Sequence, residues 1–284
     1  MLVAAFRGWN DGAQGASLAA GFLARAWHAR RFGDIDPEEF FDFQAVRPHV
    51  SLEEGLTRRI DWPENAFYSA SVPVVPPAHE RDVVLLLGIE PNTRWRAFTG
   101  EIVGLAQELG VELVVTLGAL LADVPHTRPC PITGSASDPK LVEELGLAAS
   151  RYEGPTGIVG VVHDACRHGS IPSASLWAAV PHYASLAPSP RAALALCQRL
   201  AELIHAELDL DELEVAGDTY ERQVSEAVAV DEETTAYVRE LERRADELEV
   251  EADLPSGETL AAELTRFLRE HEERRRQEEE DDSM

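Results

Sequence analysis

The sequence predicts an α/β fold with a mostly parallel sheet, and three observations support this. Short runs of branched apolar residues recur along the chain, which is the pattern of strands buried on both faces. Segments with helical periodicity lie between them. Polar side chains follow several of the runs, where open α/β sheets place ligands. The chain has 284 residues, 45% of them hydrophobic, which is enough for a sizeable core.

The N-terminal part predicts a strand, a turn and a helix. Leu2–Phe6 is a short apolar strand, and the helix Ala13–Trp27 follows the turn GWNDG. Asn10 or Asp11 would cap this helix by accepting hydrogen bonds from its first free N–H groups. A glycine-flanked turn at a helix N-terminus can equally hold an anion or a carbonyl group.

The next segments are less regular. Phe40–Phe43 predicts a strand, and Arg47–Asn65 predicts strands or a loop excursion over one end of the sheet. Val83–Ile89 is a continuous apolar run and predicts a central strand. Phe98–Leu109 has helical periodicity and is closed by Gly110.

A proline-rich loop interrupts the middle of the chain. It follows the predicted strand Leu113–Leu117 and covers Asp123–Gly134. So many prolines exclude a helix here. The next helix is expected to begin at Ser137-Asp138, with Pro139 in its first turn. A long polar loop at a sheet edge is either a lid on a pocket or a contact surface for another subunit.

The stretch from residue 152 to 184 predicts a strand, a helix and a strand. Ile158–Val162 is the first strand, Asp164–Gly169 the short helix and Ser175–Val180 the second strand. Such a βαβ unit would place His163 and His182 at the carboxyl edge of the sheet.

Polar groups that follow the expected strand ends form a candidate ligand pocket. Its members are Asn10, Asp11, Glu90, Arg94, Thr133, Glu153, His163, Asp164 and His182. The alternative is that the two histidines are ordinary loop or cap residues. No catalytic residue is assigned, because no serine lies in GxSxG. The histidines lack HExxH spacing and the single lysine, Lys140, follows no phosphate loop, so we expect no metal and no cofactor.

The C-terminal part predicts helices and is strongly acidic. We expect a helix over Ala192–Leu208 and a further candidate helix at Val224–Val228. We also expect a helical hairpin whose two arms contain Tyr237–Leu248 and Leu260–Leu268. The predicted organisation is a body over residues 1–215, a helical extension over 216–270 and an acidic, disordered tail over 271–284.

Charge and composition limit the kinds of partner that the protein is expected to bind. The formal net charge is −26, and residues 201–284 hold 29 acids against 9 bases. This field repels nucleic acid and anionic membranes. No apolar run is long enough to span a bilayer and the first residues lack a leader pattern, so a cytoplasmic protein is expected. The three cysteines, odd in number and without CxxC spacing, predict reduced thiols.

Four motifs resemble the proteasome assembly chaperone 2 (PAC2) family as it occurs in actinobacteria. They are GWNDG, GIEPNTRW, TRPCPITGSASD and the stretch from Tyr152 to Tyr183, and the agreement covers most of residues 1 to about 215. The resemblance implies a three-layer α/β/α body, similar to nucleoside phosphorylases and peptidyl-tRNA hydrolases, with self-association. For relatives in other kingdoms it implies help in assembling the α-ring of the 20S proteasome.

Two function classes follow. The first is a non-catalytic interaction protein, a homo-oligomer (a trimer is one candidate) that binds proteasome α-type subunits. The chain ends in Asp282, Ser283 and Met284 rather than the hydrophobic-Tyr-X tail of some related chaperones, so the body or the helical hairpin would have to make the contact. The second is an enzyme or a binder of a nucleoside-type or phosphate-type ligand at the sheet's carboxyl edge.

Overall fold

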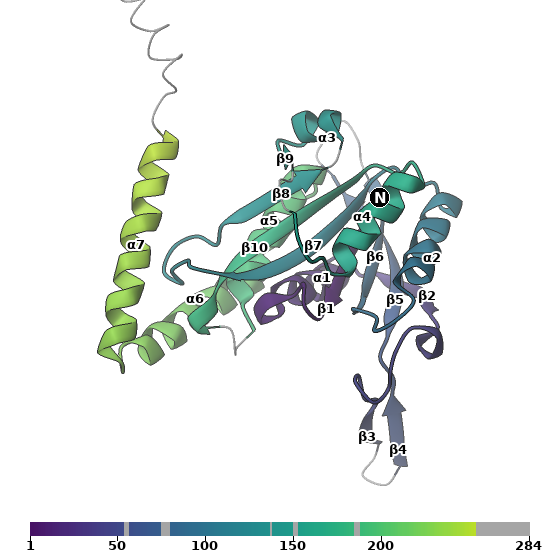
Figure 1. The fold of residues 1–284 in the computed structure, drawn as a ribbon, viewed down its shortest axis with the longest axis horizontal. Coiled ribbons are helices and arrows are strands. Elements are labelled where there is room, and N and C mark those ends of the chain that lie inside the picture. The colour runs from purple at the N-terminus through teal and green to yellow at the C-terminus, as the bar shows by residue number, and fades with distance from the viewer. Residues whose placement is uncertain (54–56, 75–79, 137, 150–152, 185–187, 254–284) are drawn as a thin grey trace, which may run out of the picture.

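The centre of the molecule is an eight-stranded sheet, seen in a computed structural model that describes residues 1–53, 57–74, 80–136, 138–149, 153–184 and 188–253 (Figure 1). The strands are β1 (Leu2–Arg7), β2 (Arg30–Ile35), β5 (Asn65–Pro73), β6 (Glu80–Ile89), β7 (Val114–Ala122), β8 (Ile132–Ala136), β9 (Ala148–Ala149) and β10 (Ser173–Pro181). Their order is β2-β5-β6-β1-β7-β10-β8-β9.

The middle of this sheet is parallel, as the sequence predicts. β1 pairs in parallel with β6 and with β7, and β7 pairs in parallel with β10. Antiparallel strands flank this centre, because β5 runs against β6 and β8 runs against β10. The buried, near-continuous apolar sequences of the four central strands are what a sheet covered on both faces requires.

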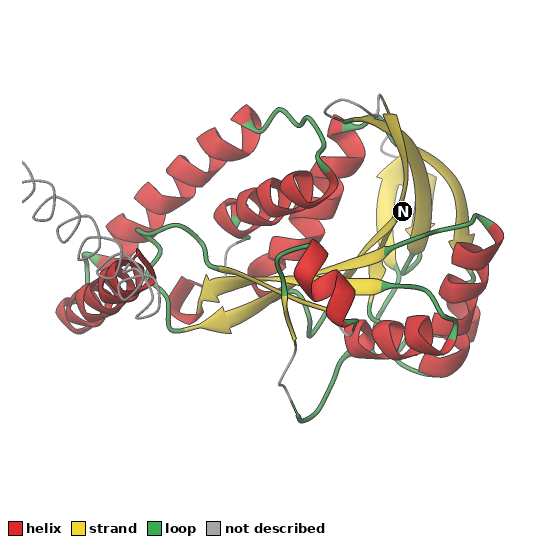
Figure 2. Ribbon diagram, turned by 90° about the horizontal axis from the view of Figure 1, so that it is seen from above, coloured by secondary structure: helices red, strands yellow, loops and turns green. Residues whose placement is uncertain are grey.

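Helices cover both faces of the sheet, which confirms the three-layer α/β/α body (Figure 2). The helices are α1 (Gly15–Ala26), α2 (Trp95–Glu108), α3 (Pro139–Glu144), α4 (Ile158–His168), α5 (Pro190–Ile204), α6 (Asp211–Val228) and α7 (Glu232–Asp253). Short 3₁₀ turns occur at Gly12–Gln14, Pro37–Glu39 and His182–Ala184. α1 and α5 pack on one face, and α2 and α4 on the other.

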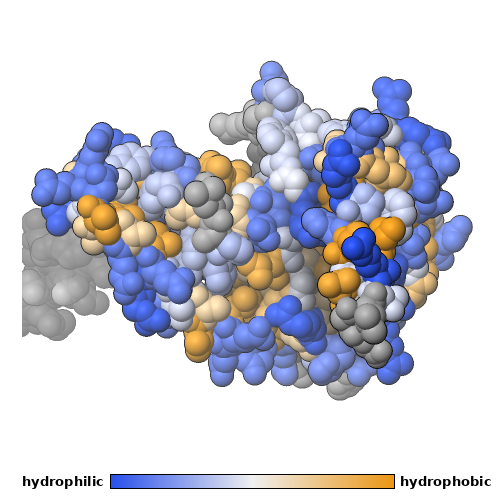
Figure 3. All heavy atoms as spheres, turned by 90° about the horizontal axis from the view of Figure 1, so that it is seen from below, coloured by the Kyte–Doolittle hydropathy of each residue, from blue (hydrophilic) through white to orange (hydrophobic). Residues whose placement is uncertain are grey.

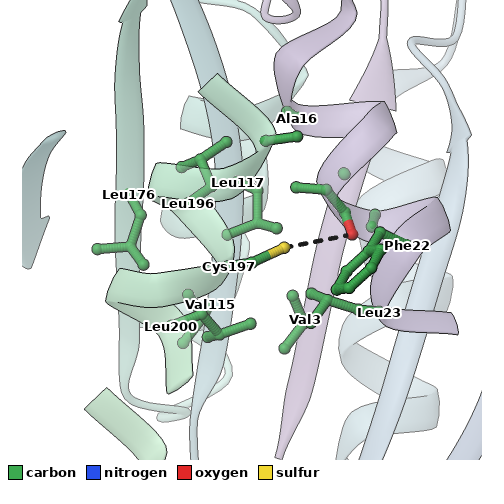
Figure 4. Close-up of a cluster of buried hydrophobic side chains, with 14 of the residues drawn as sticks. Val3, Ala16, Phe22, Leu23, Val115, Leu117, Leu176, Leu196, Cys197 and Leu200 are labelled. Atoms are coloured by element: carbon green, nitrogen blue, oxygen red, sulfur yellow. Dashed lines mark hydrogen bonds between the residues drawn. The ribbon is translucent and has the colours of Figure 1, made fainter. Parts of the chain in front are cut away.

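Alternation along β1 shows how the strands feed both cores. Val3 and Ala5 join the α1–α5 core, whereas Leu2, Ala4 and Phe6 join the α2–α4 core, because successive side chains of a strand point to opposite faces. In the first core, Cys197 of α5 lies among Leu196, Leu200 and Leu23, and its thiol donates to the Ala19 carbonyl of α1 at 3.8 Å (Figure 4).

Two predicted strands are wrong. Ile158–Val162 is the first part of α4, since its apolar residues continue to Cys166 at helical spacing and face the sheet. Four branched residues and one glycine are too few for periodicity to separate a strand from a buried helix. Phe40–Phe43 forms a turn after a 3₁₀ helix, where Phe40 packs edge-on against Phe98 at 5.3 Å. The predicted βαβ unit is therefore wrong as well, because only its second strand, β10, exists.

Two arms leave the body (Figure 1). The hairpin arm is the two-stranded sheet of β3 (His49–Glu53) and β4 (Thr57–Asp61), which corresponds to the predicted excursion. The helical arm is α6 and α7, and the expected boundary at residue 215 lies inside α6. The second predicted hairpin segment, Leu260–Leu268, and the tail 271–284 lie outside the described residues. Among the helices described, none has the length and apolarity needed to cross a bilayer.

Candidate functional site

The loop after β1 and the start of α4 meet at the carboxylate of Glu90, which directly follows β6. Asn10 Nδ2 and the Ile158 backbone N–H both donate to Glu90 Oε1, at 3.0 and 2.8 Å. The backbone N–H of Trp9 donates to the other oxygen at 3.2 Å. The positive end of the α4 dipole therefore already holds a carboxylate, at the position where α/β folds often bind an anionic ligand.

Gly157, the residue before α4, leaves room for this junction. A Cβ at this position would lie 2.4 Å from Asn10 Oδ1 and 2.8 Å from Glu90 Oε1. No real Cβ contact is that short. The glycine at position 157 is thus explained by close packing of the helix start on the Asn10 and Glu90 side chains.

Asp11 caps α1. Its Oδ1 accepts hydrogen bonds from the backbone N–H groups of Ala16, at 2.8 Å, and Ser17, at 3.2 Å. Burial raises the pKa of this carboxyl above its ordinary value, and the hydrogen bonds from Ser17 and Ala16 oppose the rise. The capping role expected of the GWNDG turn is confirmed for Asp11.

His163 lies inside α4 and faces the sheet. Its Nε2 hydrogen-bonds Thr116 Oγ1 of β7 at 2.8 Å, and its Nδ1 hydrogen-bonds Ser173 Oγ of β10 at 2.9 Å. Burial lowers the pKa of His163 to about 4, so the ring is neutral near pH 7. Both ring nitrogens are occupied, and we interpret this histidine as a polar tie between α4 and the sheet.

Four further candidates, Arg94, Thr133, Glu153 and Asp164, are exposed. Arg94 pairs with Glu39, and Asp164 pairs with Arg167 at 2.6 Å on the exposed side of α4. Thr133 is exposed on β8, opposite Trp177 of β10. Glu153 is exposed in the loop before α4.

The geometry thus brings together Asn10 and Glu90, with Asp11 in the same loop. Among the described residues, no hydrogen bond or ion pair links these three to any other candidate. A pocket of about 190 Å³ lies on the α1 side of the sheet, between Arg7, Ser17, Glu64 and Tyr68. None of the nine candidates lines it. A common ligand site for the nine residues stays a prediction.

His182, the last candidate, belongs to an aromatic cluster between the body and the helical arm. Its ring lies 5.7 Å from the rings of Tyr183 and Tyr237, and these two tyrosines contact each other edge-on at 6.3 Å. His182 Nδ1 lies 3.3 Å from the Asp123 carboxylate, which also accepts a hydrogen bond from the Tyr237 hydroxyl at 3.1 Å. Tyr237 is on α7, so this cluster joins the body to the helical arm.

His126 continues the same contact toward α6. It is only 3% exposed, its Nδ1 hydrogen-bonds the Tyr183 hydroxyl at 2.8 Å, and its Nε2 hydrogen-bonds Ser225 Oγ of α6 at 2.9 Å. Burial lowers the pKa of His126 below its ordinary value. Since both ring nitrogens have partners, His126 fixes the proline-rich loop and α6 to each other.

Ion pairs complete the attachment of the helical arm. Arg128 donates to both carboxylate oxygens of Asp246, at 2.6 and 2.9 Å, and Arg191 of α5 pairs with Glu221 of α6. The proline-rich loop is therefore a contact surface for this chain's own helical arm. The sequence predicts a lid or a contact surface for another subunit, so the contact with α6 and α7 of the same chain, through His126 and Arg128, is not among its predictions. The signal for them in the sequence is the run of polar residues between Pro125 and Pro129.

Burial and internal hydrogen bonds set the state of the ionisable groups in this part of the molecule. Burial raises the pKa of the Cys130 and Cys166 thiols to about 11, so neither is a thiolate at neutral pH. Within the described part of the chain, no three His, Cys, Asp or Glu side chains are placed to hold a metal ion. The side chains of Glu90, His126 and His163 are held by hydrogen bonds within the protein.

Comparison with known proteins shows which family and which solved structures this chain resembles. The sequence profile of the PAC2 family matches residues 5–228. A PAC2 family protein from Streptomyces avermitilis is 47% identical and superposes with a TM-score of 0.77, covering 84% of this chain and 98% of that one. A proteasome-assembly chaperone homologue from Mycobacterium tuberculosis is 43% identical, with a TM-score of 0.74 and coverages of 84% and 99%.

More distant structures share the fold alone. An archaeal proteasome activator from Pyrococcus furiosus is 15% identical, with a TM-score of 0.62, and covers 80% of this chain and 92% of its own length. No curated protein matches the chain.

Proposed function

The chain belongs to the PAC2 family, and we propose that it is a non-catalytic, self-associating protein that resembles a proteasome assembly chaperone and binds proteasome α-type subunits. The observation that carries this proposal is the 43% identity to the mycobacterial chaperone homologue along 84% of the chain. The family match covers residues 5–228, a range that includes the body and α6.

The helical arm is the partner-binding element in this proposal. Sixteen acidic and four basic residues in 211–253 give it a net charge of −12. Its exposed apolar side chains include Val230, 87% exposed, and Leu248, 66% exposed. An acidic surface with apolar anchors suits a protein surface rich in Arg and Lys, and charge complementarity would speed the encounter. The body and the arm act here as separate functional units.

The alternative function, a small ligand at the carboxyl edge of the sheet, has less support. The Glu90 carboxylate already accepts the Ile158 N–H at the start of α4. A phosphate placed there would meet this carboxylate at close range, and two anions repel each other at such a distance.

Native mass spectrometry of the full chain with the α-type proteasome subunits of its own host tests the proposal. A mixed complex is expected, and Val230→Asp and Leu248→Asp should weaken it. Leu109→Asp is the matched control, because Leu109 is 49% exposed at the end of α2, away from the arm. If the full chain forms no mixed complex with any α-type subunit, the proposed function is wrong.

A further inference from the structure

The pocket of about 190 Å³ on the α1 side of the sheet has an apolar floor of mostly small side chains. Ala5 of β1 lies opposite Leu87 of β6, and Leu87 lies opposite Ala66 of β5, so these three side chains lie side by side on one face. Ala20 of α1 lines the pocket from the helix. Protein interiors leave few voids larger than a water molecule. Three alanines at facing positions therefore explain why α1 and the sheet leave a hollow here.

Polar side chains line the same pocket. Arg7 follows Ala5 by two residues on the same face of β1, at the carboxyl edge of the sheet, and Glu64 comes just before β5, on the other side of β6. Tyr68 lies further inside, opposite Leu85. β5 follows the hairpin arm, and Figure 3, which views the protein from the side on which that arm projects, shows apolar side chains among hydrophilic ones beside it.

The charge of Arg7 is available to an anionic ligand. The side chain is exposed, and among the residues that the structure describes no hydrogen bond or ion pair involves its guanidinium. Burial raises the pKa of Asp11, and the Arg7 charge opposes this rise, but the Asp11 carboxylate is held at the start of α1 by backbone N–H groups. The second charged residue of the pocket, Glu64, already pairs with Arg31 at 2.8 Å. The pocket therefore favours a negative group beside Arg7.

The size of the pocket limits the ligand to a small molecule. Drug-sized ligands occupy pockets of about 300–1,000 Å³, so a nucleotide is too large for this one. An apolar protein cavity of about 150 Å³ can hold benzene. We therefore expect a ligand of about six to nine non-hydrogen atoms.

We propose that this pocket binds a small organic carboxylate with a short apolar body. The carboxylate accepts hydrogen bonds from the Arg7 guanidinium, whose planar fork of N–H groups matches it. The apolar body covers the floor of Ala5, Ala66 and Leu87. This site goes beyond the proposed function. It is also separate from the Glu90 junction, because Glu90 contacts the start of α4, which packs on the other face of the sheet.

Isothermal titration calorimetry of the full chain with pentanoate, a carboxylate in the expected size range, tests the site. Pentanamide has the same shape without the charge, and inorganic phosphate has the charge without an apolar body. Pentanoate is expected to bind, and the other two should bind about tenfold more weakly or less, because each lacks one half of the recognition.

Two variants connect this binding to the pocket. Arg7→Gln removes the cation and should weaken pentanoate binding by about tenfold or more, since hydrogen bonds between charged groups are among the strongest. Arg96→Gln is the matched control, because Arg96 is exposed on α2, on the opposite side of the sheet. Ala66→Leu fills the floor and should abolish binding. Circular dichroism checks that each variant keeps the fold, and Arg7→Gln is expected to keep it because Arg7 is exposed.

Three outcomes would overturn the site. The wild-type chain could fail to bind pentanoate at every concentration. Pentanamide or phosphate could bind as tightly as pentanoate, which would contradict recognition of a carboxylate with an apolar body. Arg7→Gln could keep the wild-type affinity, or Arg96→Gln could lose as much, and either result would place the binding elsewhere on the protein. None of these outcomes affects the binding of α-type subunits, which is measured separately.

Discussion

Arg128 and Asp246 lie 118 residues apart in the sequence, yet the Arg128 guanidinium donates hydrogen bonds to both oxygens of the Asp246 carboxylate. This two-pronged contact is the outermost attachment between the proline-rich loop and α7. It holds the pKa of Asp246 below its ordinary value. Bidentate pairs of this kind fix orientation as well as distance, so the pair acts together with the Tyr237 contacts to hold α7 in its direction.

The first prediction concerns this attachment. Arg128→Ala should loosen α7 from the loop, because the Asp246 and Glu242 carboxylates lose their common partner. Amide hydrogen exchange in α7 should become several-fold faster while α1 and α5 stay protected. Arg243→Ala is the control, because Arg243 pairs only with residues of α7 itself among the contacts described, Glu240 and Glu247. Equal exchange in both variants would contradict the assigned role.

The second prediction concerns the start of α4. Glu90→Ala removes the acceptor of the Ile158 and Trp9 N–H groups and of the Asn10 amide. Leaving partly buried donors unpaired should lower the free energy of unfolding by about 1–3 kcal/mol. Glu90→Gln keeps one acceptor oxygen and should lose less. Chemical denaturation measures both, and an unchanged midpoint in Glu90→Ala would show that water replaces the carboxylate.

The sequence predicts most of this fold but not the start of α4. The central strands and the helices α1, α2 and α5 follow from apolar runs, capping residues and glycine stops. The prediction of a strand at Ile158–Val162 is wrong because a short branched run fits both a strand and a buried helix. The distinguishing fact is tertiary: Ile158, Val162 and Cys166 pack on the face of the sheet opposite α5.

The sequence predicts the candidate site only in part, because contacts between distant parts of the chain leave no local pattern. The sequence places polar groups after strand ends, and Asn10 and Glu90 do meet. His126 and Tyr183 were missed because their partners, Ser225 and Tyr237, lie far along the chain on helices whose docking no local pattern specifies.

The third prediction compares two glycines. Gly157→Ala should destabilise the protein by about 1–3 kcal/mol, the usual cost of overpacking, because the new Cβ would clash with Asn10 and Glu90. Gly104→Ala is the matched control inside α2, where a Cβ meets no atom within 4 Å. It should stabilise the protein by about 0.5–1 kcal/mol, since alanine favours a helix interior. Thermal unfolding of the two variants checks the opposite signs, and a loss of stability in both would contradict the assigned clash.

The fourth prediction is a pH dependence from His163. Burial depresses its pKa to about 4 in the folded protein, whereas an unfolded histidine titrates near 6.5. Between these values the unfolded chain binds a proton that the folded chain refuses. The contribution of His163 to the free energy of unfolding is therefore constant above about pH 6.5 and falls as the pH drops toward 4, by up to about 1.4 kcal/mol per pH unit.

Denaturation curves recorded between pH 7.5 and 4 measure how the free energy of unfolding changes with pH. This range covers the interval between the two pKa values and extends about one unit above it. His163→Gln should be less stable at pH 7, because the hydrogen bonds to Thr116 and Ser173 are lost or strained, and its stability should depend less on pH. His168→Gln, at an exposed position on the same helix, is the matched control for replacing a histidine of α4. If His163→Gln and the wild type show the same slope, the buried imidazole is not the group that destabilises the fold in acid, and His126, whose pKa is also lowered by burial, becomes the residue to replace next.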